Sequence, residues 1–286
     1  MEFDASKVGA ALGWAREQLT SVEDIDQPQQ EAELILATVL RLTRAQLLGW
    51  DDSGLSEAQA LRFAQLVTRR AHGEPFAYLA GEREFWTLTL RVTPDVLVPR
   101  PETELLVERA LHRGGQRTAL EVADLGTGCG CIALALASER PRWRITATDV
   151  SAAALDVARE NAARLQLPTV EFVISDWFAN LTQRRFALLL SNPPYIAATD
   201  SSLLHGALRF EPQLALTPGA DGLAALQTLC TLAPPHLLSG GALMLEHGAG
   251  QADAVRGMLV ARGFAQVTSH CDLAGIERVT EGTWCS

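Results

Sequence analysis

One stretch of the chain decides the fold: Asp124-Leu125-Gly126-Thr127-Gly128-Cys129-Gly130-Cys131. It follows an apolar run at residues 120–124 and leads into a second apolar run at 132–139 that has helical character. Glycines in such a loop allow a tight turn and let the backbone approach a ligand closely, while the first N–H groups of the following helix remain free to bind it. The stretch therefore predicts a strand, a ligand-binding loop and a helix in succession.

The glycine spacing and one acidic residue narrow the choice of ligand. The glycines follow G-x-G-x-G, whereas a dinucleotide-binding loop follows G-x-G-x-x-G, so a pyrophosphate is an imperfect match. Asp149 ends the next predicted strand, where a carboxylate can accept hydrogen bonds from the ribose of NAD or of S-adenosylmethionine. The alternative is a purely structural glycine turn that joins a strand to a helix without binding a ligand. The order of strand, loop and helix, with an acid at the end of the next strand, disfavours it.

From residue 101 onward, predicted strands alternate with predicted helices. The strands cover residues 120–124, 145–149, 170–174, 186–191 and 242–246. The helices cover residues 132–139, 152–165, 222–238 and 251–262. This alternation predicts an α/β fold with a doubly wound, mainly parallel, Rossmann-like sheet. Residues 264–272 and 278–284 are two further strands whose connection is too short for a parallel crossover, so we expect an antiparallel last strand.

The first 81 residues have a helical pattern and form a separate predicted domain. Amphipathic segments lie at residues 10–15, 29–40 and 56–71, and Ser56 is the expected N-cap of the third. Acidic residues outnumber basic ones in this part, which predicts a small acidic helical bundle.

A β-hairpin is predicted to link the two domains. The alternating pattern at residues 85–92 and 96–98 indicates two strands, with a turn at Thr93-Pro94-Asp95. The predicted organisation is a helical domain at 1–81, a hairpin linker at 82–100 and an α/β domain at 101–286.

Asp176 and Trp177 directly follow the predicted strand at 170–174. Ligands bind at the carboxyl edge of such sheets, so Trp177 can cover one face of an adenine and Asp176 can accept a hydrogen bond from its exocyclic amine. A tryptophan is also commonly a core residue. Both interpretations of Trp177 stay open from the sequence.

The turn Asn192-Pro193-Pro194-Tyr195 follows the fourth predicted strand and faces the same edge. Prolines fix φ, bias the preceding residues to extended geometry and remove two N–H donors, so the local groups are mainly acceptors. We expect the Asn192 side-chain oxygen and the Pro193 carbonyl each to accept one proton of a planar NH2 group, with Tyr195 packed on the plane. In isolation, a rigid proline turn without chemistry would be the simpler explanation.

Composition and charge limit the classes of function. The net charge of -10 argues against a broad electrostatic grip on nucleic acid. The N-terminal residues show no basic segment followed by an apolar one, and no apolar run is long enough for a membrane helix, so we expect a cytoplasmic protein. Five cysteines without a C-x-x-C pair indicate reduced thiols and no structural metal.

Two motifs together resemble the class I S-adenosylmethionine-dependent methyltransferases that act on exocyclic or amide nitrogens: Gly-Thr-Gly-x-Gly and Asn-Pro-Pro-Tyr. Further stretches resemble one bacterial family in particular, the release-factor glutamine methyltransferases known as PrmC or HemK. These stretches are Gly81-Glu82-Arg83-Glu84-Phe85-Trp86, Pro99-Arg100-Pro101-Glu102-Thr103-Glu104, Ser175-Asp176-Trp177-Phe178, Arg209-Phe210-Glu211-Pro212 and Leu245-Glu246-His247-Gly248. The first eighty residues are similar only in their helical character.

The resemblance implies a substrate and a set of site residues. In that family the substrate is the glutamine of the Gly-Gly-Gln motif of class 1 peptide chain release factors, and the product is N5-methylglutamine. The residues implied to contact S-adenosylmethionine are Gly126, Thr127, Gly128, Cys129, Gly130, Asp149, Trp177 and Asn192. The turn Asn192-Pro193-Pro194-Tyr195 is implied to hold the glutamine, and Arg100 with residues 209–212 to shape the peptide entrance. Cys129 departs from the threonine or small residue common at its position, where the backbone makes the contact.

Two rival functions remain open from the sequence. The same turn can present the exocyclic amine of adenine N6 or guanine N2 in a nucleic acid, although the acidic charge and the lack of a basic recognition segment count against it. An inactive binding protein of the same fold is the other rival, and the intact motifs count against that one. The helical domain, which carries no catalytic constellation, is expected to recognise the release factor.

Overall fold

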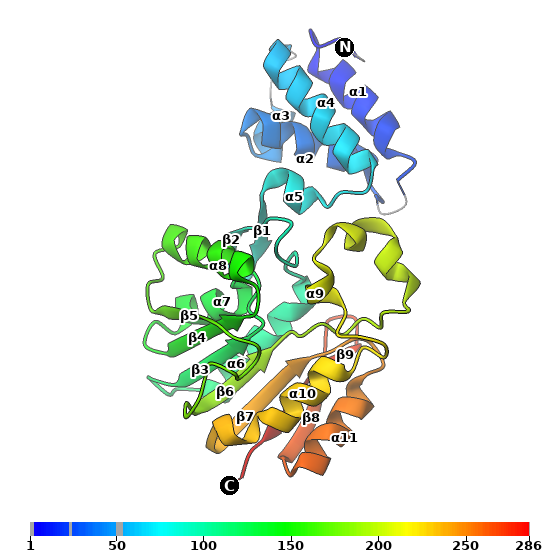
Figure 1. Cartoon of the computed structure of the whole chain (residues 1–286). Helices are drawn as coiled ribbons and strands as arrows, with labels where there is room; N and C mark the ends of the chain where they lie inside the picture. The colour runs from blue at the N-terminus through cyan, green and yellow to red at the C-terminus, as the bar shows by residue number, and fades with distance from the viewer. Residues whose placement is uncertain (1–2, 23–24, 50–53, 286) are drawn as a thin grey trace. The chain divides into compact units, whose positions relative to one another are not determined.

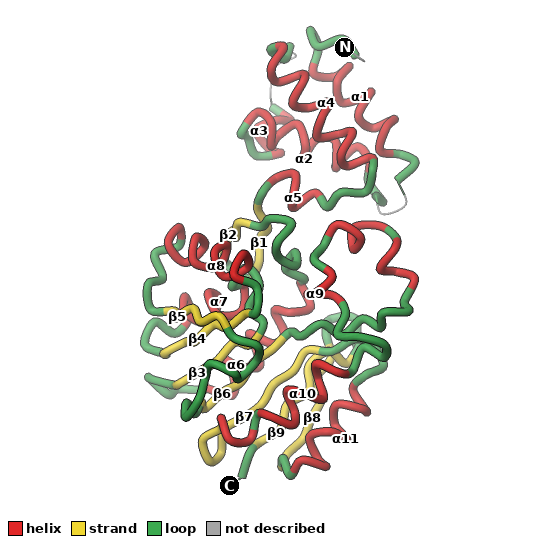
Figure 2. Tube along the Cα trace, in the orientation of Figure 1, coloured by secondary structure: helices red, strands yellow, loops and turns green. Residues whose placement is uncertain are grey.

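The computed structural model describes residues 3–22, 25–49 and 54–285 (Figure 1). The chain divides into two compact units. One unit consists of Met1–Gly81 and Leu204–Phe210, and the other of Glu82–Leu203 and Glu211–Ser286. The first unit is helical and the second is α/β (Figure 2). The hairpin region thus lies in the α/β unit, and seven residues from far along the chain lie in the helical unit.

The helical unit contains the elements α1 (Val8–Leu19), α2 (Pro28–Leu40), α3 (Arg44–Leu48), α4 (Glu57–Ala71) and α5 (Phe76–Ala80). The predicted N-cap of α4 is confirmed: the Ser56 hydroxyl accepts a hydrogen bond from the Gln59 N–H, and the Gln59 side chain reaches back to the Ser56 N–H. Such a capping box satisfies two N–H groups that the helix itself cannot pair.

A separate apolar core holds the helical unit together. Helices α1, α2 and α4 bury Leu19, Ile35 and Phe63 between them. The segment Leu204–Phe210 joins this unit through Arg209, whose guanidinium donates to the His72 carbonyl just after α4. The same guanidinium lies 4.9 Å from the centre of the Phe210 ring, at cation–π distance.

The α/β unit is built on a seven-stranded sheet with the order β5-β4-β3-β6-β7-β9-β8. The strands are β3 (Glu121–Leu125), β4 (Arg144–Asp149), β5 (Val170–Ile174), β6 (Phe186–Ser191), β7 (Leu237–Glu246), β8 (Ala265–Cys271) and β9 (Glu277–Thr283). Strands β3 to β7 are parallel, and β9 is antiparallel to both β7 and β8. The predicted doubly wound sheet with an antiparallel end is confirmed.

Helices cover both faces of the sheet (Figure 1). They are α6 (Glu104–Gly114), α7 (Cys131–Glu139), α8 (Ala152–Arg164), α10 (Ala224–Leu232) and α11 (Ala252–Arg262). The short α9 (Gln213–Leu216) lies in the long connection between β6 and α10. Leu243 and Leu245 of β7 pack in one core with residues of α10 and α11. Because side chains alternate along a strand, Met244 and Glu246 point to the opposite face, where α6 contacts the same strand. None of the helices in the described part of the chain has the length and apolarity needed to cross a bilayer.

The hairpin is present, but the predicted position of its turn is wrong. The strands are β1 (Glu82–Phe85) and β2 (Leu88–Arg91), so the turn lies at residues 86–87 and not at the proline. Tertiary anchors set this turn: the Trp86 N–H donates to Glu104 Oε1 and the indole N–H to Glu139 Oε1, both at 2.8 Å, while Trp86 adopts a φ of 58°. Residues 96–98 form no strand, since the Val98 N–H donates to Glu211 Oε2 (3.1 Å). The alternating pattern could not reveal these distant partners.

The helix predicted over residues 222–238 is also too long. Helix α10 ends at Leu232, a 3-10 turn covers Pro234–His236, and β7 begins at Leu237. Consecutive prolines cannot continue an α-helix, because each lacks an N–H donor and its ring clashes with the preceding turn. The prolines therefore mark the boundary between α10 and β7.

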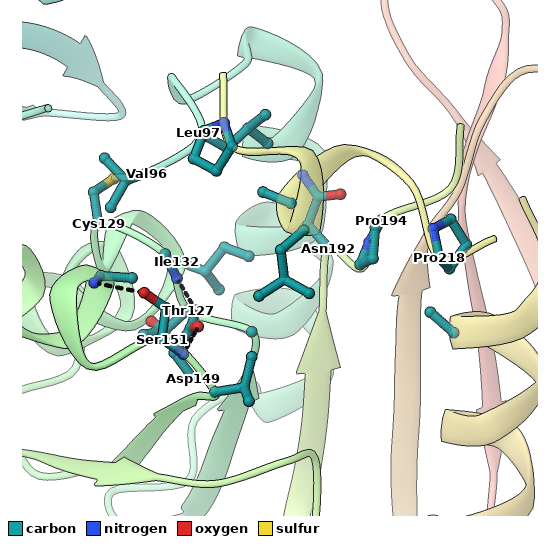
Figure 3. Close-up of a pocket in the computed structure, with 18 of the residues that line it drawn as sticks. Val96, Leu97, Thr127, Cys129, Ile132, Asp149, Ser151, Asn192, Pro194 and Pro218 are labelled. Atoms are coloured by element: carbon teal, nitrogen blue, oxygen red, sulfur yellow. Dashed lines mark hydrogen bonds between the residues drawn. The ribbon is translucent and has the colours of Figure 1, made fainter. Parts of the chain in front are cut away.

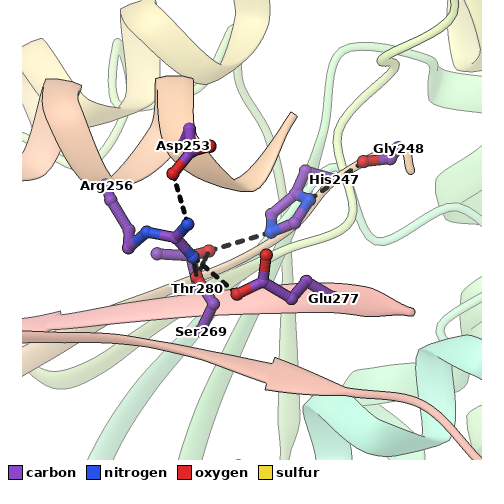
Figure 4. Close-up of polar contacts among 7 residues, drawn as sticks. All are labelled: His247, Gly248, Asp253, Arg256, Ser269, Glu277 and Thr280. Carbon is purple, nitrogen blue, oxygen red and sulfur yellow. Dashed lines mark hydrogen bonds and ion pairs between the residues drawn. The ribbon is translucent and has the colours of Figure 1, made fainter. Parts of the chain in front are cut away.

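A buried polar network holds the chain just after β7 (Figure 4). His247 is fully buried. Its Nε2 is 2.8 Å from the Thr280 hydroxyl oxygen, and its Nδ1 is 3.1 Å from the Gly248 carbonyl oxygen. A carbonyl only accepts, so Nδ1 carries the proton, and burial lowers the pKa of this imidazole. Ser269 and Arg256 extend the network to β8 and α11. The end of β7 is thereby tied to β9 and β8.

Gly114, the last residue of α6, tests the packing of this helix against Trp143. A Cβ on Gly114 would lie 2.3 Å from Cζ2 of Trp143, a rigid and fully buried ring. We expect Gly114→Ala to lower the free energy of unfolding by about 1–3 kcal/mol, as overpacking does. Gly257→Ala in α11 is the matched control, because nothing lies within 4 Å of its added Cβ, and it should raise stability by about 0.5–1 kcal/mol. Urea unfolding measures both, and equal effects of the two substitutions would contradict the packing described.

Candidate active site

The glycine loop joins β3 to α7 and depends on glycine at three positions. Gly126, Gly128 and Gly130 have φ values of 75°, 56° and 88°, in the left-handed region that favours glycine. The N–H groups of Gly126 and Thr127 both donate to the Thr148 carbonyl at 2.8 Å, which attaches the loop to the end of β4. The predicted strand, loop and helix are therefore confirmed, with the loop held against the neighbouring strand.

A cavity of about 480 Å³ opens beside this loop (Figure 3). Its walls come from the carboxyl ends of β3, β4, β5 and β6, the edge at which doubly wound sheets bind ligands. The predicted site residues that line it are Gly126, Thr127, Gly128, Cys129, Asp149, Trp177, Asn192 and Pro194. Gly130 lies outside the lining and serves packing, because a Cβ there would lie 3.0 Å from Leu134 Cδ1.

The Asp149 carboxylate connects the loop to the end of β4. Oδ2 accepts from the Gly128 N–H and Oδ1 from the Ser151 N–H, each at 2.9 Å. Burial raises the pKa of Asp149, while these N–H groups oppose the shift. A carboxylate oxygen has more than one acceptor direction, so Asp149 can hold the loop and still accept from a ribose hydroxyl.

Trp177 both packs against the core and lines the cavity, and its contact with an adenine stays a prediction. Its φ is 46°, and Ser175 holds this turn by donating to the Trp177 carbonyl at 2.9 Å. The indole packs against the apolar core and also lines the cavity together with Asp176. A Cβ on Gly126 would lie 3.6 Å from the Trp177 ring, so the glycine and the indole are neighbours in the cavity lining.

The proline turn brings two of its four residues to the cavity. Asn192 and Pro194 line it, whereas Pro193 is buried and neither Pro193 nor Tyr195 is among the lining residues. Asn192 Nδ2 donates to the Thr103 hydroxyl at 3.0 Å, which leaves Oδ1 as the free acceptor. Its place at the wall of the cavity is visible in Figure 3.

Tyr195 lies differently from the expected packing on a substrate amide. Its hydroxyl is 3.4 Å from Glu246 Oε1, and its carbonyl accepts from Gln251 Nε2 at 3.0 Å. Burial raises the pKa of Tyr195, so the phenol stays protonated and donates to the carboxyl. The side chain therefore supports the turn from behind, because the core beside β7 offers it an apolar wall and an acceptor.

Several lining residues had no sequence signal of their own. Thr103, at the end of the 3-10 turn Pro101–Thr103, and Val96 and Leu97 form one side of the cavity. The opposite side comes from residues 212–228, which include Leu214 and Pro218. Their positions depend on long-range contacts, and only the resemblance in the segments around Thr103 and Pro212 pointed toward them.

Asp124 is a buried acid of the loop stretch to which the sequence assigned no role. Its Oδ2 accepts from the Thr127 hydroxyl at 2.6 Å, and burial raises its pKa to about 7. Thr127 lines the cavity while Asp124 is fully buried beneath it. Asp124 therefore orients the glycine loop through its hydrogen bond with Thr127.

The residues expected to shape the peptide entrance, Arg100 and 209–212, do not all belong to one unit. Arg100 lines the cavity and pairs at 2.5 Å with Glu211, whose side chain has no exposed surface. Pro212 also lines the cavity, whereas Arg209 and Phe210 belong to the helical unit. Glu211 holds the 98–100 segment by accepting from both the Val98 N–H and Arg100.

Comparison with known proteins identifies both parts of the chain. Residues 10–81 match the family described as PrmC N-terminal domain, and residues 101–210 match the family described as Methyltransferase small domain. A 16S rRNA methyltransferase from T. thermophilus, solved in complex with AdoMet and guanosine, has a TM-score of 0.52 at 19% identity, covering 71% of this chain and 49% of that chain. This likeness shows a shared methyltransferase fold.

Two curated relatives are far more similar in sequence. The release factor glutamine methyltransferase of Burkholderia pseudomallei is 50% identical over 258 residues, which cover 88% of this chain and 90% of the relative. The protein of the same name from Bordetella pertussis is 50% identical over 256 residues, covering 89% of this chain and 94% of the relative. The chain therefore belongs to the release factor glutamine methyltransferase family.

Proposed function

We propose that the protein methylates the side-chain amide nitrogen, N5, of the glutamine in the Gly-Gly-Gln motif of class 1 peptide chain release factors, with S-adenosylmethionine as the methyl donor. Membership of the family supports this activity. The observation that carries the proposal is the Asn192 side chain, which lines the cavity and donates from Nδ2 to Thr103. Its oxygen is left to accept a proton from a substrate NH2 group.

The cavity suits S-adenosylmethionine better than a dinucleotide. Its volume of about 480 Å³ lies in the range typical of small-molecule sites. The loop Gly126 to Cys129 offers backbone to the ligand, Asp149 offers acceptors for the ribose, and Trp177 offers an aromatic face for the adenine. We assign the methyl donor to these residues, with Asn192 at the end of the site where the acceptor nitrogen enters.

The chain's own residues act mainly on the acceptor nitrogen. An amide nitrogen is a weak nucleophile because its lone pair is delocalised into the carbonyl. When bound, S-adenosylmethionine supplies an electrophilic sulfonium methyl group. Asn192 Oδ1 accepts one amide proton, which aligns the nitrogen and stabilises positive charge developing on it. The Pro193 carbonyl is the second acceptor expected from the sequence, and it belongs to a buried residue outside the cavity lining. Orientation of this kind can lower a barrier by up to about 7–11 kcal/mol. In the overall reaction an N–CH3 bond replaces one amide N–H bond, the electron pair of the broken S–CH3 bond stays on sulfur as S-adenosylhomocysteine, and the displaced proton passes to solvent.

A protein acceptor agrees with the charge of the chain and with its second unit. The net charge is -10, which opposes binding along a phosphate backbone. The cavity residues all belong to the α/β unit, so the helical unit is free for recognition of the release factor. Because release factors act on ribosomes, we place the reaction in the cytoplasm.

The acceptor is tested with labelled S-adenosylmethionine and three substrates: release factor, RNA and DNA. We expect label only on the release-factor glutamine, and Asn192→Ala should lower kcat by about 10²–10³, as loss of a preorganised hydrogen-bond partner does. Mass spectrometry locates the methyl group. Asn192→Asp keeps an acceptor oxygen and should retain part of the activity. Label on RNA or DNA instead, or a normal kcat for Asn192→Ala, would overturn the proposed amide recognition.

Calorimetry tests the donor site. We expect S-adenosylmethionine to bind and NAD not to bind. Asp149→Ala should weaken donor binding by about 1.5–3 kcal/mol, the contribution of hydrogen bonds to a charged group. Asp156→Ala is the control, because this acid is exposed on α8 in an ion pair with Arg159 and lies outside the cavity lining. Preferential binding of NAD would exclude the methyltransferase assignment.

Removal of the helical unit tests its proposed role in recognition. A chain that begins at Glu82 should show a raised KM for the intact release factor, because the proposed docking surface is missing. Its Kd for S-adenosylmethionine and its KM for a short Gly-Gly-Gln peptide should change little. Circular dichroism must first show that the truncated chain is folded, since Leu204–Phe210 loses its packing partners. An unchanged KM for the intact factor would mean that the helical unit does not recognise it.

A further inference from the structure

A buried carboxyl group lies directly behind the proline turn. Glu246 is the last residue of β7, the strand next to β6, and only 1% of its surface is exposed. Its Oε1 accepts from the Tyr195 hydroxyl at 3.4 Å, at one end of the turn. Its Oε2 is buried and has no hydrogen-bond partner within 3.5 Å among the described residues. A buried carboxylate oxygen without a hydrogen-bond partner costs free energy of folding, so its presence calls for a specific reason such as a role in the site.

The Thr103 hydroxyl connects this carboxyl to the other end of the turn. It accepts from Asn192 Nδ2 at 3.0 Å, so its own hydrogen remains to be donated. The Thr103 hydroxyl is close enough to the Glu246 carboxyl to lower its pKa, although Glu246 Oε2 has no partner within 3.5 Å. The uncommitted hydrogen of Thr103 and the unpartnered Oε2 of Glu246 are therefore complementary. Thr103 itself is 1% exposed and lines the cavity.

This arrangement determines which end of the Asn192 amide faces the substrate. A Thr103 hydroxyl whose hydrogen is directed at Glu246 can only accept from Asn192, which matches the observed bond from Nδ2 and leaves Oδ1 for the cavity. We propose that Glu246 is a positioning residue for methyl transfer, which orients the Asn192 amide through Thr103 and holds Tyr195 directly. Without the acceptor on Glu246, Thr103 can donate to Asn192 Oδ1, and the flipped amide then meets the substrate NH2 donor to donor. The inference rests on the proposed function, in which Asn192 binds a glutamine amide.

The environment of Glu246 sets the pH range in which its side chain is ionised. Burial is the main cause that raises the pKa of Glu246 to about 7. Nearby Glu102 acts in the same direction, while Thr103, Tyr195 and Arg278 oppose the shift. The thiol of Cys131 on α7 is the other titratable neighbour, and its pKa lies well above the usual range. The acceptor form of Glu246 is therefore present above about pH 7 and is lost as the pH falls. We expect kcat to fall with it.

Three substitutions test the role of Glu246. Thr103→Val removes the hydroxyl at constant shape, and Glu246→Gln removes the charge, so each should lower kcat at pH 8 by about 10- to 100-fold, as loss of a partner behind a functional side chain does. Thr103→Ser keeps the hydroxyl and should recover most of the kcat that Thr103→Val loses. The Kd for S-adenosylmethionine should stay within about twofold in all three, because none of them contacts the donor loop. The acidic fall in kcat below pH 7 should disappear in Glu246→Gln.

Matched controls and the pH profile separate positioning from folding. Thr231→Val on α10 and Glu108→Gln on α6 make the same changes at exposed positions outside the cavity. They should leave kcat and its pH dependence unchanged. Asp124 titrates in the same range, so an acidic fall that persists in Glu246→Gln would assign it to Asp124. That result, or a normal kcat for Thr103→Val, would overturn the role of Glu246.

A measurement that needs no activity keeps this inference distinct from the proposed function. In ¹⁵N-labelled protein, the side-chain NH2 resonances of Asn192 should shift with pH around 7 in the wild type. They should not shift there in Glu246→Gln, and Asn192→Ala assigns them by their loss. If the wild type methylates no release factor but the resonances behave in this way, the acceptor assignment fails and the positioning role of Glu246 remains. Resonances that ignore Glu246→Gln would refute the positioning role alone.

Discussion

The hydrogen bond from the Gly128 N–H to the Asp149 carboxylate is the interaction on which the site depends. It joins the β3–α7 loop to the end of β4, and the Thr148 carbonyl reinforces the junction by accepting from two loop N–H groups. The loop can reach these partners only because its glycines adopt positive φ. A Cβ at these positions would strain the backbone and bring side chains toward Trp177 or Leu134. The geometry of the proposed donor site is thus a consequence of backbone conformation stabilised by one acid.

The acceptor side is built from a different constraint. Two prolines remove N–H donors from the turn after β6, so that carbonyl and amide oxygens dominate there. The turn gains its support from elements that are distant in sequence: Thr103 before α6 contacts Asn192, and Glu246 at the end of β7 contacts Tyr195. A rigid set of acceptors suits the weak nucleophilicity of an amide, because orientation and electrostatic stabilisation then replace a strong base.

The two units have separate cores. The cavity residues all lie in the α/β unit, whereas the helical unit has its own apolar centre around Phe63. The segment Leu204–Phe210 complicates this division, since it follows the proline turn in the chain yet is part of the helical unit. The Arg209 contact to the His72 carbonyl attaches it there. Glu211, the next residue after this segment, is buried against Arg100 at the cavity.

The sequence by itself determined the features that depend on local patterning. The bounds of β5 and β6 were predicted to the residue, and the glycine loop, the Ser56 cap and the antiparallel end of the sheet followed from short-range rules of spacing and chain connection. Tertiary contacts decided the rest. The hairpin turns at Trp86 because Glu104 and Glu139 accept its two N–H groups. Thr103 and Glu246 meet the proline turn only in the folded sheet, since 89 and 51 positions separate the partners Thr103–Asn192 and Tyr195–Glu246. Periodicity carries no information about such pairings, because they arise when the carboxyl ends of parallel strands come together at one edge.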